Sequence, residues 1–242
     1  IVALPPDDLE RLSRASAAPA AKAASPALRA VPELAQFLAS IREHDAEALR
    51  QLMARTQSRL GLGRFVLDVV APLNVQVGEA WMQGRLQVFE EHLYTEAVQA
   101  VLRNGLHSLP VAGAGRPRVL LATVPGEPHG LGLLMAETVF SLEGCRCTSL
   151  GVQTPIWDIV RAAAAMRSDV VALSITGCTN PHQICDGLTE LRSKLPAEVQ
   201  LWAGGSAPVL QRRAVAGVRV LPRLEDIGEA LADWHRGSDG RA

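Results

Sequence analysis

A carboxylate and an imidazole stand two residues apart near the middle of the chain, in the stretch Glu127-Pro128-His129-Gly130. Imidazole is the commonest metal ligand among side chains, provided that it is neutral and correctly oriented. A neighbouring carboxylate can accept the proton of the other ring nitrogen, which fixes the tautomer and raises ligand basicity. The spacing predicts that Glu127 prepares His129 as a nitrogen ligand. A solvated loop histidine is the alternative that these residues alone leave open.

A second group of aromatic and polar residues lies upstream, between two segments of helical pattern. Trp81 closes the first segment, and Glu91 with His92 begins the next. A short connection between antiparallel helices brings such residues to one end of a bundle. There, an indole beside a polar pair suggests a pocket for a flat polar ligand. The alternative is that Trp81 packs the bundle end while Glu90 and Glu91 favour the positive start of the following helix.

Apolar residues at helical spacing predict four helices between residues 31 and 109. The expected helices begin at about Pro32 and after Asp45, and run over about 64–83 and 88–109. Pro72 lies inside the third and predicts a kink. Four helices with short connections form an antiparallel bundle, the simplest way to bury four apolar stripes.

The pattern changes after residue 117, where short β-rich runs alternate with helix-like stretches. The runs are 118–124, 146–151, 169–175, 199–203 and 218–221. Continuous apolar runs without alternation are typical of parallel strands covered on both faces. Residues 117–236 are therefore expected to form a doubly wound, flavodoxin-like (Rossmann-type) α/β domain with a five-stranded parallel sheet. Ligands bind such sheets at the carboxyl ends of the strands, where the strand order reverses.

The loops after the first, third and fourth expected strands resemble those of cobalamin-binding domains. The family pattern is Asp-x-His-x-x-Gly, then Ser-x-Leu or Ser-x-Thr, then Gly-Gly. The matching residues are Glu127, His129, Gly132, Ser174, Thr176, Gly204 and Gly205. The resemblance implies that His129 is the lower cobalt ligand and that the nucleotide tail lies beside the serine and the glycines. Glu127 departs from the usual Asp by one methylene, and ordinary turn chemistry is the alternative for the small residues.

The connection between the third and fourth helices resembles a motif of light-sensing MerR-type regulators of the CarH and LitR kind, Trp-x-x-Gly-x-Leu-x-Val-x-Glu-Glu-His. The match runs through Trp81, Gly84, Leu86, Val88, Glu90, Glu91 and His92. The resemblance implies adenosylcobalamin as the dark cofactor, with Trp81, Val88 and Glu91 around its adenosyl group. It further implies that light breaks the cobalt–carbon bond and that His92 then becomes the upper cobalt ligand of the photoproduct.

The same resemblance implies partners: a homo-oligomer, tetrameric in the dark, and operator DNA bound through an N-terminal winged-helix domain. Residues 1–12 resemble the exit from that domain, and residues 15–30 have the small-residue and proline composition of a linker. Residues 1–30 are therefore expected to be the tail of a DNA-binding domain that these 242 residues lack, followed by an Ala/Pro linker.

Net charge, hydropathy and cysteine content exclude several classes of protein. A net charge of -1 gives no overall attraction to nucleic acid or membrane. No apolar run approaches the roughly 18 to 20 residues that cross a bilayer, so we expect a cytoplasmic protein. The resemblance to the regulators implies that it is not an enzyme. The four cysteines form no CxxC pair and are expected to be structural. Trp157 and Trp202 are expected in the core, and His44 in solvent.

Two alternatives to the light sensor are open. A corrinoid carrier of a methyltransferase system shares the bundle, the sheet and the lower histidine, but it passes a methyl group between enzymes and needs an accessible cobalt. A binding module or antirepressor for another chromophore would make His129 incidental. The segment around Trp81 and His92 favours the sensor over both, because a histidine able to cap cobalt would hinder methyl transfer.

Overall fold

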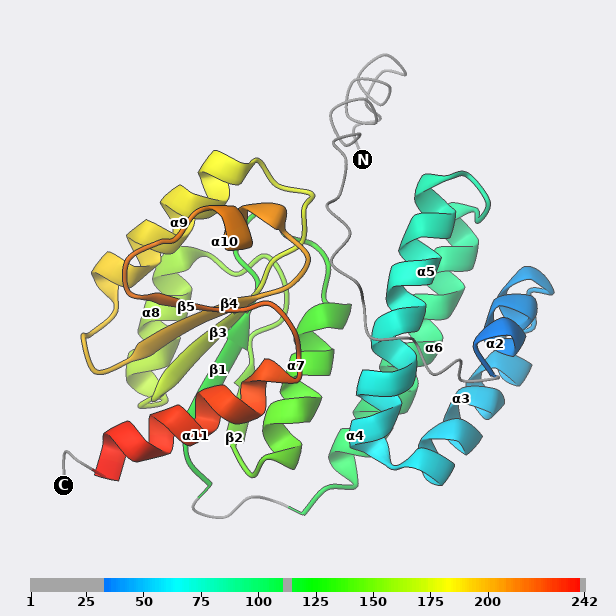
Figure 1. Ribbon diagram of the computed structural model, residues 1–242, viewed down its shortest axis with the longest axis horizontal. Coiled ribbons are helices and arrows are strands. Elements are labelled where there is room, and N and C mark those ends of the chain that lie inside the picture. The colour runs from blue at the N-terminus through cyan, green and yellow to red at the C-terminus, as the bar shows by residue number, and fades with distance from the viewer. Residues whose placement is uncertain (1–32, 111–114, 240–242) are drawn as a thin grey trace. The chain divides into compact units, whose positions relative to one another are not determined.

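The computed structural model describes residues 33–110 and 115–239 (Figure 1). Residues 1–30, expected to contain a domain tail and a linker, lie outside the described residues. The first described part is helical, and its elements are α2 (Glu33–Arg42), α3 (Ala46–Leu60), α4 (Leu62–Arg64), the π-helical turn η1 (Phe65–Val70), α5 (Ala71–Met82) and α6 (Val88–His107). Helix α3 packs against both α2 and α6, and its buried residues contribute to the core of this part.

Local chemistry accounts for several of these boundaries. The Asp45 side chain accepts a hydrogen bond of 2.9 Å from the backbone N–H of Ala48 and caps α3. The expected helix over 64–83 is interrupted by the π-helical turn η1, which ends at Val70, two residues before Pro72. A proline has no N–H to donate and its ring crowds the preceding turn. Pro72 consequently lies in the first turn of α5, where neither effect is costly.

The start of α6 is tied to the turn between α2 and α3. The Glu90 carboxylate accepts a 2.7 Å hydrogen bond from the Gln87 backbone N–H and closes a capping box. The other carboxylate oxygen lies 3.1 Å from Nε2 of His44, whose ring meets Phe89 edge-on. The expectation that His44 is merely solvated was incomplete, since its ring anchors the helix that carries Glu91 and His92.

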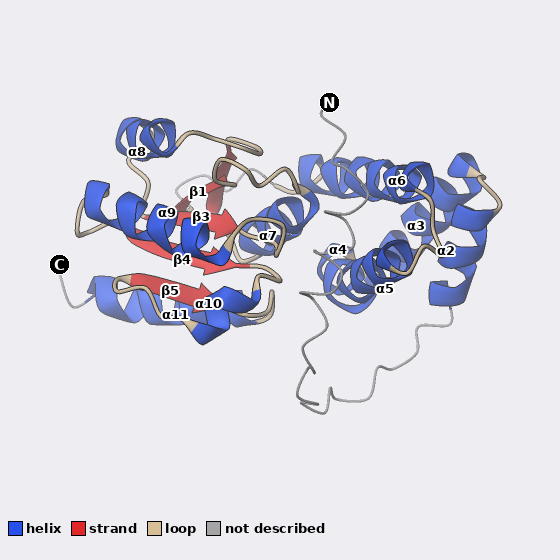
Figure 2. Ribbon diagram, turned by 90° about the horizontal axis from the view of Figure 1, so that it is seen from above, coloured by secondary structure: helices blue, strands red, loops and turns tan. Residues whose placement is uncertain are grey.

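The second part contains five parallel strands with helices on both faces (Figure 2). The strands are β1 (Arg118–Ala122), β2 (Arg146–Ser149), β3 (Val170–Ser174), β4 (Gln200–Gly204) and β5 (Val218–Leu221), and the helices are α7 (Leu131–Leu142), α8 (Ile156–Ala165), α9 (Pro181–Lys194), α10 (Pro208–Arg212) and α11 (Asp226–Asp239). The strand order is β2-β1-β3-β4-β5, the flavodoxin-like order with its switch point between β1 and β3. The predicted fold class is confirmed.

Alternate residues of each strand face opposite layers of helices. Leu120, Val171 and Leu201 belong to a core cluster that includes α8 and α9. Leu121 and Ala172 are register partners on the opposite face, which α7 and α11 cover. Trp202, buried in β4, confirms its expected place in the core, whereas Trp157 is 55% exposed on α8. The expectation for Trp157 is therefore wrong: its ring lies at the surface, where the Lys194 ammonium stands 4.1 Å from the ring centroid in a cation–π contact.

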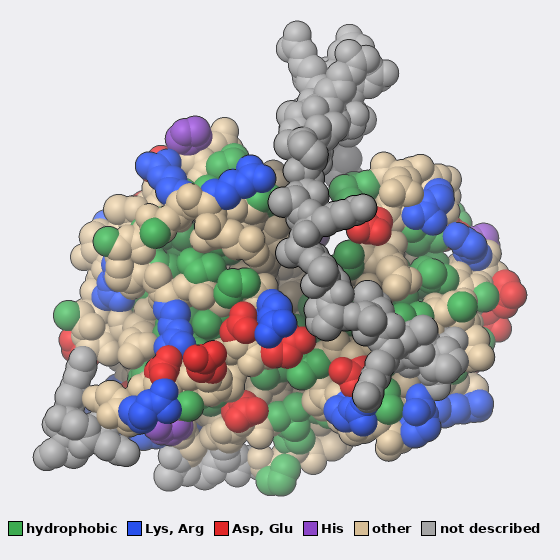
Figure 3. All heavy atoms as spheres, viewed as in Figure 1, with side chains coloured by type: hydrophobic (Ala, Val, Ile, Leu, Met, Phe, Trp, Pro, Cys, Tyr) green, Lys and Arg blue, Asp and Glu red, His purple; other side chains and the backbone are tan. Residues whose placement is uncertain are grey.

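Acidic and basic side chains are interspersed on the molecular face seen in Figure 3, in keeping with the near-zero net charge. No helix among residues 33–110 and 115–239 combines the length and the apolar character needed to cross a membrane.

Asp169, just before β3, ties the starts of two adjacent strands together. Its carboxylate accepts hydrogen bonds from the Arg118 backbone (2.8 Å) and guanidinium (3.1 Å), and from Arg116 (2.7 Å). Burial alone raises the pKa of Asp169, but the arginines outweigh it and hold the pKa at about 2. A pKa below the unfolded value stabilises the fold above about pH 4, and this contribution is lost as the pH falls toward 2.

We therefore expect Asp169→Asn to lower the free energy of unfolding at pH 7 by about 1 to 3 kcal/mol, because two guanidinium groups lose a charged partner. The difference from wild type should shrink as the pH falls from 4 toward 2. Urea denaturation over a pH series measures both effects. Asp158→Asn, which removes an exposed 3.7 Å pair with Arg161, should change stability by less than about 0.5 kcal/mol. Equal effects of the two variants would contradict this assignment.

Candidate functional site

The loop after β1 holds a fully buried carboxylate beside a half-exposed imidazole. Oε1 of Glu127 lies 2.7 Å from Nδ1 of His129 and accepts a 3.1 Å hydrogen bond from the His129 backbone N–H. Oε2 accepts hydrogen bonds from the backbone N–H (2.6 Å) and the hydroxyl (2.8 Å) of Thr176, in the loop after β3. Both oxygens are therefore satisfied, and the carboxylate bridges the two loops at the switch point of the sheet.

The electrostatics of this pair determine which nitrogen of His129 is available. Burial raises the pKa of Glu127, but the hydrogen bonds from Thr176 and His129 outweigh it, so the pKa lies below its usual value. An ionised carboxylate only accepts, so Nδ1 of His129 carries the proton. In the neutral imidazole Nε2 then keeps its lone pair, and the side chain is 57% exposed. This is the arrangement that a metal-ligating histidine requires.

A thiol also reaches this cluster. Sγ of Cys178 lies 3.2 Å from the Thr176 hydroxyl and 3.5 Å from Oε1 of Glu127. Ligand-type atoms of Glu127, His129 and Cys178 all lie within 4.8 Å of one another. Cys178 was expected to be structural, but the structure places it, exposed, against the carboxylate that orients His129.

Small residues of the neighbouring loops leave no room for side chains. A Cβ on Gly132 would lie 2.8 Å from Oγ of Ser174, and one on Gly204 would lie 3.0 Å from the Leu221 carbonyl oxygen. At Gly205, φ is +117° and a Cβ would lie 2.2 Å from the Ile175 carbonyl oxygen. Glycine is required here by both backbone conformation and space, which goes beyond ordinary turn preference.

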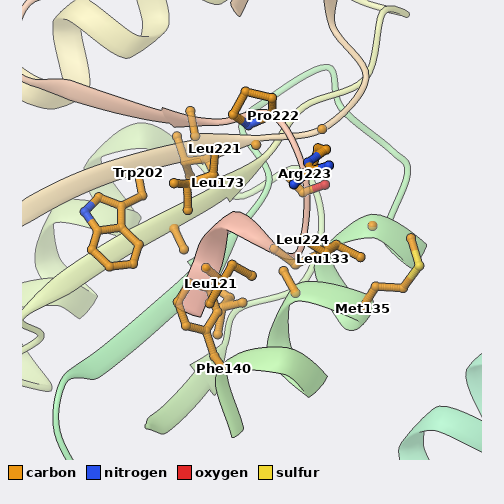
Figure 4. Close-up of a pocket in the computed structure, with 18 residues that line it drawn as sticks. Leu121, Leu133, Met135, Phe140, Leu173, Trp202, Leu221, Pro222, Arg223 and Leu224 are labelled. Atoms are coloured by element: carbon orange, nitrogen blue, oxygen red, sulfur yellow. The ribbon is translucent and has the colours of Figure 1, made fainter. Parts of the chain in front are cut away.

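These residues border a cavity of about 130 Å³ between the sheet, α7 and the start of α11 (Figure 4). Its lining includes Gly132, Ser174, Gly204 and Gly205, all predicted site residues. It also includes residues that the sequence analysis did not single out: Leu121, Phe140, Ala172, Leu221, Arg223 and Ile227. No motif marks them, because each is an ordinary core or loop residue of its element.

The predicted upper group lies in the helical part, around the α5–α6 connection. Trp81, the penultimate residue of α5, is 48% exposed, and Val88, the first residue of α6, is 57% exposed. Exposed large apolar side chains gathered at one place mark a surface for a ligand or a partner. The buried Leu86 anchors the connection between them.

His92 repeats the pairing found at His129. Its Nδ1 lies 2.8 Å from Oε2 of Glu91, and Oε1 of Glu91 accepts a 2.7 Å hydrogen bond from the Thr95 hydroxyl. In both pairs, Nδ1 of the histidine faces a glutamate carboxylate, and that carboxylate accepts a hydrogen bond from a threonine hydroxyl. The pairs differ in burial, because Glu91 is partly exposed whereas Glu127 has no exposed surface. Thr95, about two turns into α6, was not identified from the sequence.

Comparison with known families agrees with this geometry in both parts of the chain. Residues 33–104 match one family model described as a B12 binding domain, and residues 117–231 match a second of the same description. The chain belongs to the B12-binding domain family. The predicted recognition is confirmed at that level, and the histidine, serine and glycines described above lie within the second B12-binding match.

Two proteins of Myxococcus xanthus are similar to this B12-binding chain. The HTH-type transcriptional repressor CarH is 36% identical over 172 residues, which are 71% of this chain and 56% of CarH. The HTH-type transcriptional repressor CarA is 28% identical over 202 residues, which are 83% of this chain and 67% of CarA. The chain thus spans little more than half of CarH.

A solved structure is similar in fold. The monomethylamine corrinoid protein of Methanosarcina barkeri aligns with a TM-score of 0.65 and 15% identity, over 82% of this chain and 96% of that one. This likeness shows the fold: a helical part followed by an α/β part.

Proposed function

We propose that this chain is the adenosylcobalamin-dependent photoreceptor part of a cytoplasmic transcriptional regulator, and not an enzyme. The observation that carries the proposal is the Glu127–His129 pair at the switch point, in which a buried carboxylate holds a half-exposed imidazole. The similarity to two HTH-type transcriptional repressors supports the regulatory role.

The residues of the sheet part fit the lower half of a cobalamin. His129 offers the lone pair of Nε2 as the lower cobalt ligand, and Glu127 with Thr176 holds its ring. The cavity bordered by Gly132, Ser174, Gly204 and Gly205 would take the end of the displaced nucleotide tail, and a Cβ on any of these glycines would push against the atoms around it.

The residues of the helical part suit the upper half. Trp81 and Val88 offer exposed apolar surface, and Glu91 offers a carboxylate, to an adenosyl group. When bound, adenosylcobalamin supplies a cobalt–carbon bond that visible light cleaves. His92, oriented by Glu91 at the start of α6, would then be the residue to hold the upper face of the cobalt, because the first turn of a helix can adjust without unfolding the rest.

The test of the proposal is a visible spectrum recorded in the dark after adenosylcobalamin is added to the protein. We expect stoichiometric binding and a spectrum in which histidine replaces benzimidazole. A spectrum identical to that of free adenosylcobalamin would refute the proposal. If the chain is instead a binding module for another chromophore, we expect this unchanged spectrum.

Light should change the assembly of the complex. We propose a homo-oligomer, tetrameric in the dark, that binds operator DNA through a domain of the whole protein outside these residues. A cofactor changes assembly only if it binds two arrangements of the protein differently. We expect the mass measured by size-exclusion chromatography with light scattering to fall after green illumination. Identical masses in dark and light would remove the switching proposal and leave cofactor binding intact.

His92 should act only after illumination. We expect His92→Ala to bind adenosylcobalamin in the dark within about threefold of wild type, since neutral surface substitutions away from a ligand have small effects. After illumination, the variant should accept added cyanide or imidazole readily, and wild type should resist exchange because His92 occupies the upper position. Absorption changes after ligand addition measure both rates. His107→Ala, at the other end of α6, is the matched control.

The fold is shared with a corrinoid protein, so a corrinoid carrier is the second candidate. A carrier must leave the cobalt accessible to partner enzymes, in the dark and in light alike. Rapid exchange with added ligand in illuminated wild type, equal to that of His92→Ala, would favour the carrier over the sensor.

A further inference from the structure

The cavity beside the sheet has a chemically uniform interior. Leu121, Ala172 and Trp202 stand side by side across β1, β3 and β4 as register partners, and all three are buried. Phe140 of α7 and Ile227 of α11 close the cavity from the opposite layer. In Figure 4 the indole of Trp202 and the side chain of Arg223 lie on opposite sides of the lining group.

Polar side chains are few among the 18 lining residues, and none is available at the buried end. The indole N–H of Trp202 already donates to Oε1 of Gln200 at 2.8 Å. Ser174 lies at the carboxyl end of β3, and the exposed Arg223 follows β5. The carbonyl groups of the buried strand residues are engaged in the parallel ladder. An aromatic ring between Leu121, Ala172 and Trp202 therefore meets apolar side chains, and the hydroxyl acceptor among the lining residues, Ser174, lies at the carboxyl end of β3.

Resting on the proposed function, we propose that this cavity selects among cobamides by the base at the end of their nucleotide tail. It takes an apolar aromatic base, such as a benzimidazole or a phenol, and disfavours a purine. An apolar cavity of about 150 Å³ is known to take a benzene ring, so 130 Å³ suits one apolar ring with the rest of the tail toward the mouth.

The physical reason lies in the exocyclic amine of adenine. An amino group buried without an acceptor loses its hydrogen bonds to water and gains none, which typically costs about 1 to 3 kcal/mol. Arg223 offers only donors and cannot satisfy it. A benzimidazole or a phenolic ring with its polar atom toward the mouth avoids this loss.

The experiment compares the adenosyl forms of three cobamides in the dark, with dissociation constants from absorption titration of the 242-residue chain. The bases are dimethylbenzimidazole, adenine and cresol. Cresol does not coordinate cobalt, so its dissociation constant includes no free-energy cost of detaching the base from the metal. We expect the adenine form to bind at least about tenfold more weakly than the cresol form. Equal affinities would overturn the proposal, whereas failure of all three to bind would instead refute the proposed function.

A matched pair of variants tests the cause. Ala172→Ser places a hydroxyl on the cavity side of β3, and Ala122→Ser places one on the opposite face of β1, within the cluster of α8 and α9. We expect the ratio of adenine to cresol dissociation constants to fall at least about threefold in Ala172→Ser and to stay unchanged in Ala122→Ser. An equal change in both variants would overturn the proposal, because the polarity of the cavity would then not set the preference.

Discussion

His129→Ala should weaken the binding of adenosylcobalamin by a factor of at least about 100. Loss of an outer partner of a metal ligand typically costs 10- to 100-fold in affinity, and loss of the ligand itself should cost no less. The spectrum of any residual complex should be that of a cobalamin that retains its own benzimidazole. Equilibrium dialysis in the dark, followed by the absorption spectrum of the bound fraction, measures both.

Two further variants serve as an intermediate case and as a control for His129→Ala. Glu127→Gln keeps an oxygen near Nδ1 of His129 but removes the charge, so we expect a loss of roughly 10-fold, between wild type and His129→Ala. His182→Ala removes an exposed imidazole at the start of α9 and should bind normally. Unchanged affinity and spectrum in His129→Ala would show that His129 is not the lower ligand.

Gly205→Ala should lower the free energy of unfolding by about 3 kcal/mol or more. Alanine at φ +117° is strained by about 1 to 3 kcal/mol, and its Cβ would stand 2.2 Å from the Ile175 carbonyl oxygen. The backbone of β3 or β4 must shift to relieve that contact, which also disturbs the hydrogen bond between the Ile175 N–H and the Gly204 carbonyl oxygen. Urea denaturation of the cofactor-free protein measures the change directly.

Gly228→Ala is the matched control in the same part of the chain. Gly228 lies in α11, and a Cβ there would meet nothing within 4 Å. Alanine should therefore stabilise the helix by about 0.5 to 1 kcal/mol. Comparable stability of Gly205→Ala and wild type would contradict the strain argument, and an equal loss in both glycine variants would point to a general sensitivity of the sheet part.

The strands were predictable from the sequence because local composition determines them. The expected run 218–221 is β5 itself, and the expected run 169–175 extends β3 by one residue at each end. The interruption before Pro72 was harder, since a proline predicts a disturbed helix but not whether the chain responds by a kink or by a π-helical turn.

The histidine of the site was predictable because its carboxylate is a near neighbour in sequence. Contacts between distant segments were not. Thr176 lies 49 residues from the Glu127 carboxylate that it holds, and His44 lies 46 residues from Glu90. The family pattern identified Thr176, but no local signal distinguishes a histidine that anchors a helix from a solvated one. Cys178 was set aside for the same reason.

The sequence positions of the residues that line the cavity determine when, during synthesis, the protein can first bind the nucleotide tail. Its residues come from β1 at Leu121 to α11 at Ile227, whereas the helical part is complete at His107. At 5 to 20 residues per second, roughly 6 to 24 s separate the end of α6 from the last wall of the cavity. The upper-face residues are thus made early, and the pocket for the tail can close only after Ile227 has been synthesised.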